Sequence, residues 1–235
     1  FPSNYLADMA GAGLHGVIGV LIALAARART GRGQFVDISY LDTTVSLLAM
    51  DASLYFMNGV VPKRGETSFT GGTAWAQALK CKDGEYLTIG CAEQQFWENL
   101  CRAIGREDLI PYRSDKEKKD WVVAELQKVF LTRTRNEWWE YLKTKETCVG
   151  PVNYFDEAFA DPQVLHRKMV LDIDHPDQGK VRQTGIPIKL SDTPGSIRRL
   201  GGGHGADTDE VLQRLGYGEK DIQAFAEGRR KRRAA

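Results

Sequence analysis

The chain has few of the residues that build metal sites and disulfide frameworks. It holds four cysteines and four histidines in 235 residues. No two cysteines form a Cys-x-x-Cys pair, and no histidine lies at metal-ligand spacing. This pattern disfavours a zinc site and a disulfide-stapled secreted fold. We therefore expect reduced thiols, a cytoplasmic type of compartment and no bound metal, with the thiols at Cys81, Cys91, Cys101 and Cys148.

A long apolar run and a strong net charge are also missing. The most apolar stretch, Leu14 to Ala26, is followed at once by Arg27 and Arg29, and it falls short of a membrane span. The net charge is +1, and the body of the chain is mildly acidic once the basic run 229–233 is set aside. We therefore expect no membrane partner and no nucleic-acid partner. We interpret the basic run as a solvated tail, with a localisation or nucleic-acid role as the alternative.

The remaining composition is that of an ordinary globular protein. Hydrophobic residues make up 42% of the chain and charged residues 27%, enough for one large domain or two smaller ones. Because the chain starts at Phe1 rather than Met, we expect the natural N-terminus, with any targeting segment, to lie upstream.

The hydrophobic pattern predicts a mixed α/β protein. Helices are expected over residues 8–29, 42–57, 93–104, 116–131, 135–144, 155–161, 207–215 and 219–227. Strands are expected over residues 34–40, 75–80, 86–90, 169–173 and 186–190, with turns at 82–85 and 175–176. Gly and Pro concentrate in residues 58–72, which we interpret as a linker. The helix, strand, helix order ahead of that linker indicates part of an α/β layer.

Asp8 is the most informative residue for function. It lies in the first turn of the predicted helix 8–29, where the helix dipole favours a negative charge. Gly13, Gly16 and Gly19 follow at a spacing of three, so that another backbone can come close to this helix. An ionised carboxylate in such a setting is a nucleophile, a base or a plain N-cap, and the residues alone leave these roles open.

Four segments of the chain carry a recognisable pattern in a fixed order. Residues 23–37 read Ala-Leu-Ala-Ala-Arg-Ala-Arg-Thr-Gly-Arg-Gly-Gln-Phe-Val-Asp. The others are Cys81-Lys82-Asp83-Gly84 ahead of Glu93-Gln94-Gln95-Phe96-Trp97, then Val149-Gly150-Pro151-Val152, then residues 185–194. Each piece is weak alone, but together they resemble CoA-transferase family III of the CaiB/BaiF type, which also contains the α-methylacyl-CoA racemases.

The resemblance implies a particular division of the chain. It implies a large α/β domain that is Rossmann-like, a smaller α+β domain, and subunits that interlock as a homodimer. Residues 1–57 would then be the C-terminal part of the large domain, 58–72 the linker, 73–165 the small domain, 166–228 the return to the large domain and 229–235 the basic tail. Since the similarity starts at the helix of Asp8, we expect the segment that carries much of the CoA site to lie upstream.

The resemblance also assigns catalytic roles to Asp8 and Glu93. In the transferases the matching aspartate attacks an acyl-CoA thioester, so that CoA passes to a carboxylic acid. In the racemases it acts as a base on the α-proton of the thioester. Glu93 matches a glutamate that supports a histidine base in the racemases, and its alternative role is that of a first-turn acid of the helix 93–104. A CoA thioester would be the substrate, with no tightly bound cofactor.

Asn4, Gly71 and Gly72 complete the candidate site. Asn4 matches a position near the pantetheine end of CoA, and its alternative is a turn residue ahead of the helix. Thr70-Gly71-Gly72 corresponds to a glycine loop that closes over the transferase intermediate, and its alternative is an ordinary linker turn. The sequence therefore predicts a CoA-transferase, with a racemase or epimerase and a non-catalytic fragment as the alternatives.

Overall fold

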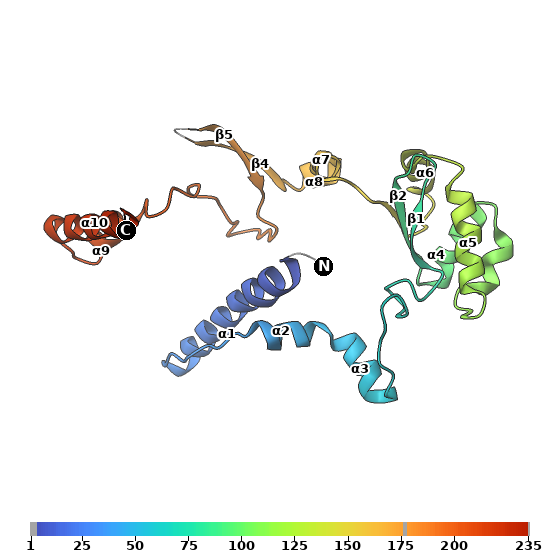
Figure 1. Ribbon diagram of the computed structural model, residues 1–235, viewed down its shortest axis with the longest axis horizontal. Coiled ribbons are helices and arrows are strands. Elements are labelled where there is room, and N and C mark those ends of the chain that lie inside the picture. The colour runs from blue at the N-terminus through green and yellow to red at the C-terminus, as the bar shows by residue number, and fades with distance from the viewer. Residues whose placement is uncertain (1–3, 176–177, 235) are drawn as a thin grey trace. The chain divides into compact units, whose positions relative to one another are not determined.

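The computed structural model describes residues 4–175 and 178–234 (Figure 1). The chain divides into two compact units between Val152 and Asn153. The predicted turn at 175–176 includes Pro176, which lies outside the described residues.

The first unit begins with helices and ends with a small sheet. Its helices are η1 (Tyr5–Leu14), α1 (His15–Thr30), α2 (Tyr40–Leu47), α3 (Ala49–Asn58), α4 (Gln94–Ala103), η2 (Glu107–Tyr112), α5 (Lys119–Phe130) and α6 (Arg135–Leu142). The strands β1 (Ala76–Lys80), β2 (Tyr86–Gly90) and β3 (Val149–Pro151) form an antiparallel sheet in that order. The predicted hairpin and the predicted helices between residues 93 and 144 are therefore confirmed.

The hydrophobic core of the first unit lies entirely between Ala74 and Leu142. Trp97 of α4 is fully buried, and its Nε1 donates to the carbonyls of Leu109 (3.3 Å) and Ile110 (3.2 Å). Trp138 of α6 is also buried, and its Nε1 donates to the Phe130 carbonyl at 2.9 Å. Because both indole donors are satisfied, the two large rings add apolar burial without a desolvation penalty.

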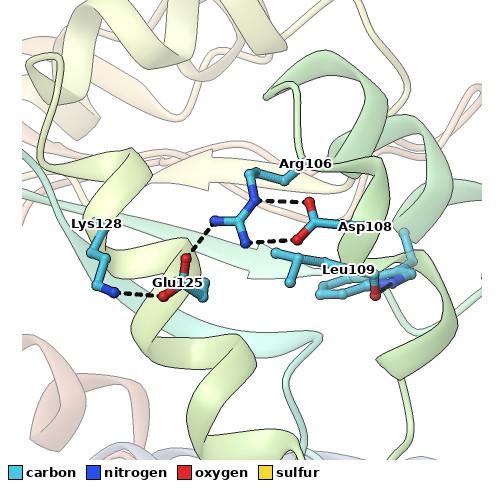
Figure 2. Close-up of polar contacts among 6 residues, drawn as sticks. Arg106, Asp108, Leu109, Glu125 and Lys128 are labelled. Carbon is cyan, nitrogen blue, oxygen red and sulfur yellow. Dashed lines mark hydrogen bonds and ion pairs between the residues drawn. The ribbon is translucent and has the colours of Figure 1, made fainter.

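An ion-pair network ties η2 to α5 beside this core (Figure 2). Arg106 holds Asp108 with two hydrogen bonds, Nε to Oδ1 at 2.9 Å and Nη2 to Oδ2 at 2.8 Å, and its Nη1 donates to Glu125 Oε2 at 2.8 Å. Lys128 reaches the other oxygen of Glu125 at 2.5 Å. The Arg106 guanidinium lowers the pKa of Asp108. Lys128 and then Arg106 lower the pKa of Glu125. Four charges thus pair with one another next to the buried Leu109.

The first helices contribute no residue to that core. Among the described residues, α1 and α3 bury none of their side chains, and large apolar side chains along η1, α1, α2 and α3 are exposed. η1 and α1 form one 26-residue helix, Tyr5–Thr30, which is long and apolar enough by composition to cross a membrane. The expectation that the apolar run falls short of that length was wrong, because residues 5–13 continue the same helix.

The predicted strand 34–40 was also wrong. Residues 32–39 have no regular secondary structure. Val36 and Ile38 nevertheless lie close to α1, because a Cβ at Gly19 would lie 3.0 Å from Val36 Cγ1 and from Ile38 Cδ1. Ser39 ends the segment by accepting the N–H groups of Leu41 (3.1 Å) and Asp42 (3.3 Å) as the N-cap of α2. A strand needs a neighbour for its backbone hydrogen bonds, and the described residues supply none here.

The predicted helix 42–57 is present as two helices. α2 ends and α3 begins around Leu48, whose ψ of 9° lies outside the helical range. At the far end of α3, Gly59 has φ 68° and its N–H donates to the Tyr55 carbonyl at 2.7 Å. A left-handed glycine of this kind is a common helix terminator. Gly31 ends α1 in the same way.

The second unit consists of short helices and a β-hairpin. Its elements are α7 (Phe155–Ala160), α8 (Pro162–His166), β4 (Val170–His175), β5 (Gly179–Thr184), α9 (Thr208–Arg214) and α10 (Glu219–Ala234). The predicted strand 186–190 was wrong: Pro187 lacks a backbone donor, and β4 pairs instead with β5. Arg182 to Asp172 at 2.8 Å and Lys180 to Asp174 at 3.1 Å link the two strands. α10 continues past the predicted end at 227.

Candidate functional site

Asp8 lies in the first turn of η1, a helix of the wide π type. The Met9 N–H donates to the Asn4 carbonyl at 3.1 Å, five residues back, as such a helix requires. Asp8 is exposed, and no hydrogen bond or ion pair in the described part of the chain engages its carboxylate. The side chain is therefore not an N-cap, and its charge lies at the positive end of a helix dipole.

The packing of η1 explains its small residues. Gly11 is buried, and a Cβ there would lie 3.0 Å from Thr43 Oγ1 of α2. Gly16, by contrast, has open space around it among the described residues. Close approach to this helix therefore takes place at Gly11 and at Gly19. His15 donates from Nδ1 to the Ala10 carbonyl of the same helix at 2.7 Å.

Asn4 occupies the N-cap position of η1. Its backbone angles are φ −85° and ψ 6°, and its side chain makes no capping hydrogen bond. In the part of the chain that the structure describes, the Asn4 carbonyl accepts the Met9 N–H. Asn4 and Asp8 therefore lie within one turn at the start of the same helix, both with exposed side chains.

Gly71 and Gly72 belong to a loop that is closed by its own hydrogen bonds. The Gly72 N–H donates to the Thr67 carbonyl at 2.9 Å, and Thr73 Oγ1 donates to the Ser68 carbonyl at 2.9 Å. Gly71 has φ 102°, and a Cβ at Gly72 would lie 2.2 Å from the Glu66 carbonyl oxygen. Both positions therefore require glycine on structural grounds alone. This supports the loop's structural role and leaves its predicted binding role open.

Glu93 precedes α4 rather than forming part of its first turn. It is the N-cap residue with extended backbone angles, its side chain makes no capping hydrogen bond, and it is exposed. Its carboxylate is close enough to contribute to raising the pKa of the Cys148 thiol, after the larger effect of desolvation. The alternative role of Glu93 as a first-turn acid of the helix is therefore wrong by one position.

The glycine loop and Glu93 flank the same end of the β1–β2 hairpin in the chain, because the loop precedes β1 and Glu93 follows β2. Ala76 pairs with Gly90 at that end, and the Cys91 N–H donates to the Trp75 carbonyl at 2.9 Å. Gln77 Nε2 donates to the Gly71 carbonyl at 3.1 Å and so fixes the loop to β1. Among the described residues, no hydrogen bond or ion pair joins η1 to this end of the hairpin. The structure thus forms two candidate groups, Asn4 with Asp8, and Gly71–Gly72 with Glu93.

Two hollows flank the glycine loop. One, of about 570 Å³, extends from Gly72 and Trp75 to Arg113 and Lys116. The other, of about 630 Å³, lies over Gly71, Trp75 and the outer ends of β1 and β2. Both volumes are in the range of small-molecule sites. The loop therefore separates two spaces in which a ligand could lie.

Arg113 is a residue of this region that sequence reasoning missed. Its Nη1 donates to the Ala92 carbonyl, and its Nε donates to Gln94 Oε1 at 3.0 Å. The guanidinium therefore binds the residues immediately before and after Glu93. No local motif marks Arg113, because its partners are about twenty residues away. Among the described residues, no group of three or more His, Cys, Asp or Glu side chains could hold a metal ion.

Comparison with known proteins gives a consistent result. The family model described as CoA-transferase family III matches residues 1–208. Human α-methylacyl-CoA racemase is 27% identical over 222 residues, which cover 94% of this chain and 57% of the racemase. A formyl-CoA:oxalate CoA-transferase of Escherichia coli is 32% identical over 246 residues, with 91% and 57% covered. These relatives are enzymes, and the chain spans little more than half of their length.

A solved structure supports the fold. The crystal structure of a CaiB/BaiF family protein from Brucella suis superposes with a TM-score of 0.67 at 28% identity, covering 88% of this chain and 55% of that one. The chain therefore shares the mixed helix and strand fold of these proteins.

Proposed function

Because this chain belongs to CoA-transferase family III, we propose that it transfers CoA from an acyl-CoA thioester to a carboxylic acid through a covalent intermediate on Asp8. The observation that supports the proposal is the state of the Asp8 carboxylate. It is exposed in the first turn of η1 and engaged by no other side chain that the structure describes. A carboxylate is a nucleophile that needs no activating base.

The chemistry follows from one carboxylate acting twice. A carboxylate oxygen of Asp8 attacks the thioester carbonyl, the C–S bond breaks, and CoA leaves as the thiolate with an aspartyl anhydride formed. The thiolate then attacks the aspartyl carbonyl, which releases the first acid and leaves an aspartyl-CoA thioester. The acceptor carboxylate repeats these two steps in reverse order, so that the new acyl-CoA forms and Asp8 is restored. Backbone amides at the start of η1 are suited to stabilise each oxyanion.

Racemisation or epimerisation of an α-methylacyl-CoA is the second candidate. Glu93 favours it, because an acid at this position is racemase-like and its side chain is exposed. In that reaction Asp8 removes the α-proton. General-base help of this kind is worth about 10²–10⁴ in rate, so stabilisation of the enolate oxygen must supply the rest. A third candidate is a non-catalytic chain, since 57% of the relatives' length is covered.

The remaining assignments belong to the same proposal. Asn4, Gly71 and Gly72 would contact the CoA thioester, which acts as substrate, with no tightly bound cofactor. The chain would work as an interlocked homodimer in the cytoplasm, without a membrane or nucleic-acid partner. Residues 1–57 and 166–228 would belong to a large Rossmann-like domain, with 58–72 as linker, 73–165 as small domain and 229–235 as a basic tail. The uncovered apolar side chains of α1 and α3 support a larger domain around them.

Trapping the intermediate tests the proposal. The chain is incubated with succinyl-CoA, and separately with a branched acyl-CoA, before hydroxylamine is added and peptides are analysed by mass spectrometry. Transfer predicts a hydroxamate on Asp8. Deuterium uptake at the α-carbon without CoA exchange would instead support racemisation. The Asp8→Asn variant is expected to lose either activity by orders of magnitude while it keeps the wild-type circular dichroism spectrum. Near-full turnover in that variant would exclude both assignments.

A further inference from the structure

The hollow of about 570 Å³ beside the glycine loop carries an excess of positive charge. Its charged lining residues are Lys63, Glu66, Arg113, Asp115, Lys116 and Lys119. Two of these are already engaged. Asp115 Oδ1 accepts the N–H groups of Glu117 (2.9 Å) and Lys118 (3.0 Å), and Lys119 pairs with Asp120 at 3.1 Å.

Three cations remain at the hollow. Lys63 and Lys116 have no ion-pair partner among the described residues, and both side chains are exposed. Arg113 is half-buried and held by the Ala92 carbonyl and Gln94 Oε1, which leaves its Nη2 without a partner in the described part of the chain. Glu66 is the one unengaged acid among the lining residues. An anchored guanidinium with a free donor is well suited to bind an oxyanion.

Part of the remaining wall of the hollow is apolar, and the rest is lined by the polar residues Asn58, Thr67, Ser68, Thr73 and Ser114. Trp75 and Ala74 are buried members of the core, and Phe69 packs edge-on against Trp75 with ring centroids 5.3 Å apart. Val60 and Val61, both exposed, also line the hollow. The hollow therefore joins a cationic rim to an apolar wall, which is the make-up of a site for a small organic anion.

We propose that this hollow binds an organic oxyanion, whose carboxylate or phosphate meets Arg113, Lys116 and Lys63 while its apolar part lies against Trp75. The carboxylate of an acid and the phosphates of a nucleotide share this chemistry. The site adjoins the glycine loop through Gly72 but requires no reaction at Asp8. Binding here is therefore separable from the transfer reaction.

Calorimetric titration of the whole chain tests the proposal with two matched pairs of probes. Glutarate is compared with glutaramide, and coenzyme A with pantetheine, which lacks the phosphates. The charged member of at least one pair is expected to bind more tightly than the neutral one, and less tightly as salt rises. A glutarate preference would identify a carboxylate ligand, and a coenzyme A preference would identify a phosphate ligand.

Lysine variants locate the binding. Lys116→Gln and Lys63→Gln are each expected to lower the affinity for the charged probe about fivefold, which is the contribution of one exposed charge pair. Lys118→Gln removes the same charge two residues from Lys116 but outside the lining of the hollow, and it should leave affinity within about twofold. The proposal is overturned if neither charged probe binds better than its neutral partner, or if Lys118→Gln costs as much as Lys116→Gln. If the charged probe binds as expected but no hydroxamate forms on Asp8, the proposed transfer reaction is wrong and the proposed binding site stands.

Discussion

Cys148 reports on the charge of Glu93. It is the exposed thiol of the four, whereas Cys81, Cys91 and Cys101 are buried. Burial, chiefly through desolvation, raises the pKa of Cys81 to about 11 and those of Cys91 and Cys101 to about 12. We therefore expect iodoacetamide to modify Cys148 alone in the native chain, because the thiolate is the reactive form. Peptide mass spectrometry gives the site and the rate.

Replacing Glu93 should change that rate. The Glu93 carboxylate raises the pKa of Cys148, so Glu93→Gln lowers it and the midpoint of the alkylation rate moves to lower pH. Glu98→Gln is the control, since the charge of Glu98 acts on Cys101 instead. An unchanged midpoint in Glu93→Gln, or an equal shift in the control, would show that Glu93 does not lie beside Cys148.

Single residues differ in how far the sequence reveals them. Asp8 and Asn4 are identified by a motif of adjacent residues, and the structure bears out only that both start one helix. Glu93 is identified in the same way, but its neighbour Cys148 is 55 positions later in the chain and comes close through the pairing of β2 with β3. Arg113 depends on the same kind of long-range contact. Patterns of neighbouring residues cannot encode such contacts, which only the folded chain creates.

The glycine loop gives a prediction at the level of an element. In Gly72→Ala the new Cβ would overlap the Glu66 carbonyl oxygen at 2.2 Å, so the loop between Glu66 and Gly72 must open. We expect a loss of about 2 kcal/mol or more in the free energy of unfolding, measured by urea denaturation. Gly90→Ala, at the paired strand end, would meet only the Cys148 carbonyl at 3.7 Å. If the two variants are equally stable, the loop geometry is wrong.

The Arg106 network, which joins η2 to α5, gives a second prediction at the level of elements. Both carboxyl pKa values are lowered in the folded chain, so their stabilisation is present above the ordinary carboxyl range and is lost as the pH falls through the lowered values. Arg106→Gln should therefore lower the melting temperature near neutral pH. The difference from wild type should shrink below about pH 4.

Arg102→Gln is the matched control for that experiment. Arg102 pairs with Glu98 at 2.7 Å, but more than half of its side chain is exposed. Surface pairs of this kind contribute little, so the melting temperature should hardly change. A constant difference between wild type and Arg106→Gln at every pH would show that packing, and not charge, accounts for the effect.

Elements that depend on local signals were predicted well, and those that depend on distant partners were not. The turn of the β1–β2 hairpin is predicted by two adjacent residues, Asp83 and Gly84. The strand expected at 34–40 has suitable alternation but no neighbouring strand among the described residues. β5 was missed because its sequence, Gly-Lys-Val-Arg-Gln-Thr, is polar, and its pairing rests on cross-strand contacts such as Arg182 with Asp172.

At the scale of the whole molecule, apolar burial is concentrated in one part of the chain. The core residues of the first unit lie between Ala74 and Leu142, while α1 and α3 bury no side chain in the described residues. Apolar burial is the main source of folding free energy. The stability of the isolated chain should therefore reside in residues 73–152.

A shortened chain of residues 73–152 tests that distribution. It should unfold cooperatively, run as a monomer in size-exclusion chromatography and cause no increase in ANS fluorescence, because its core is complete and its sheet includes β3. The 235-residue chain should brighten ANS or associate, since exposed apolar patches as extensive as those of η1 to α3 bind dyes or other surfaces. If the shortened chain fails to fold while the whole chain is monomeric and ANS-dark, the first helices must be covered by contacts that carry the stability of the molecule.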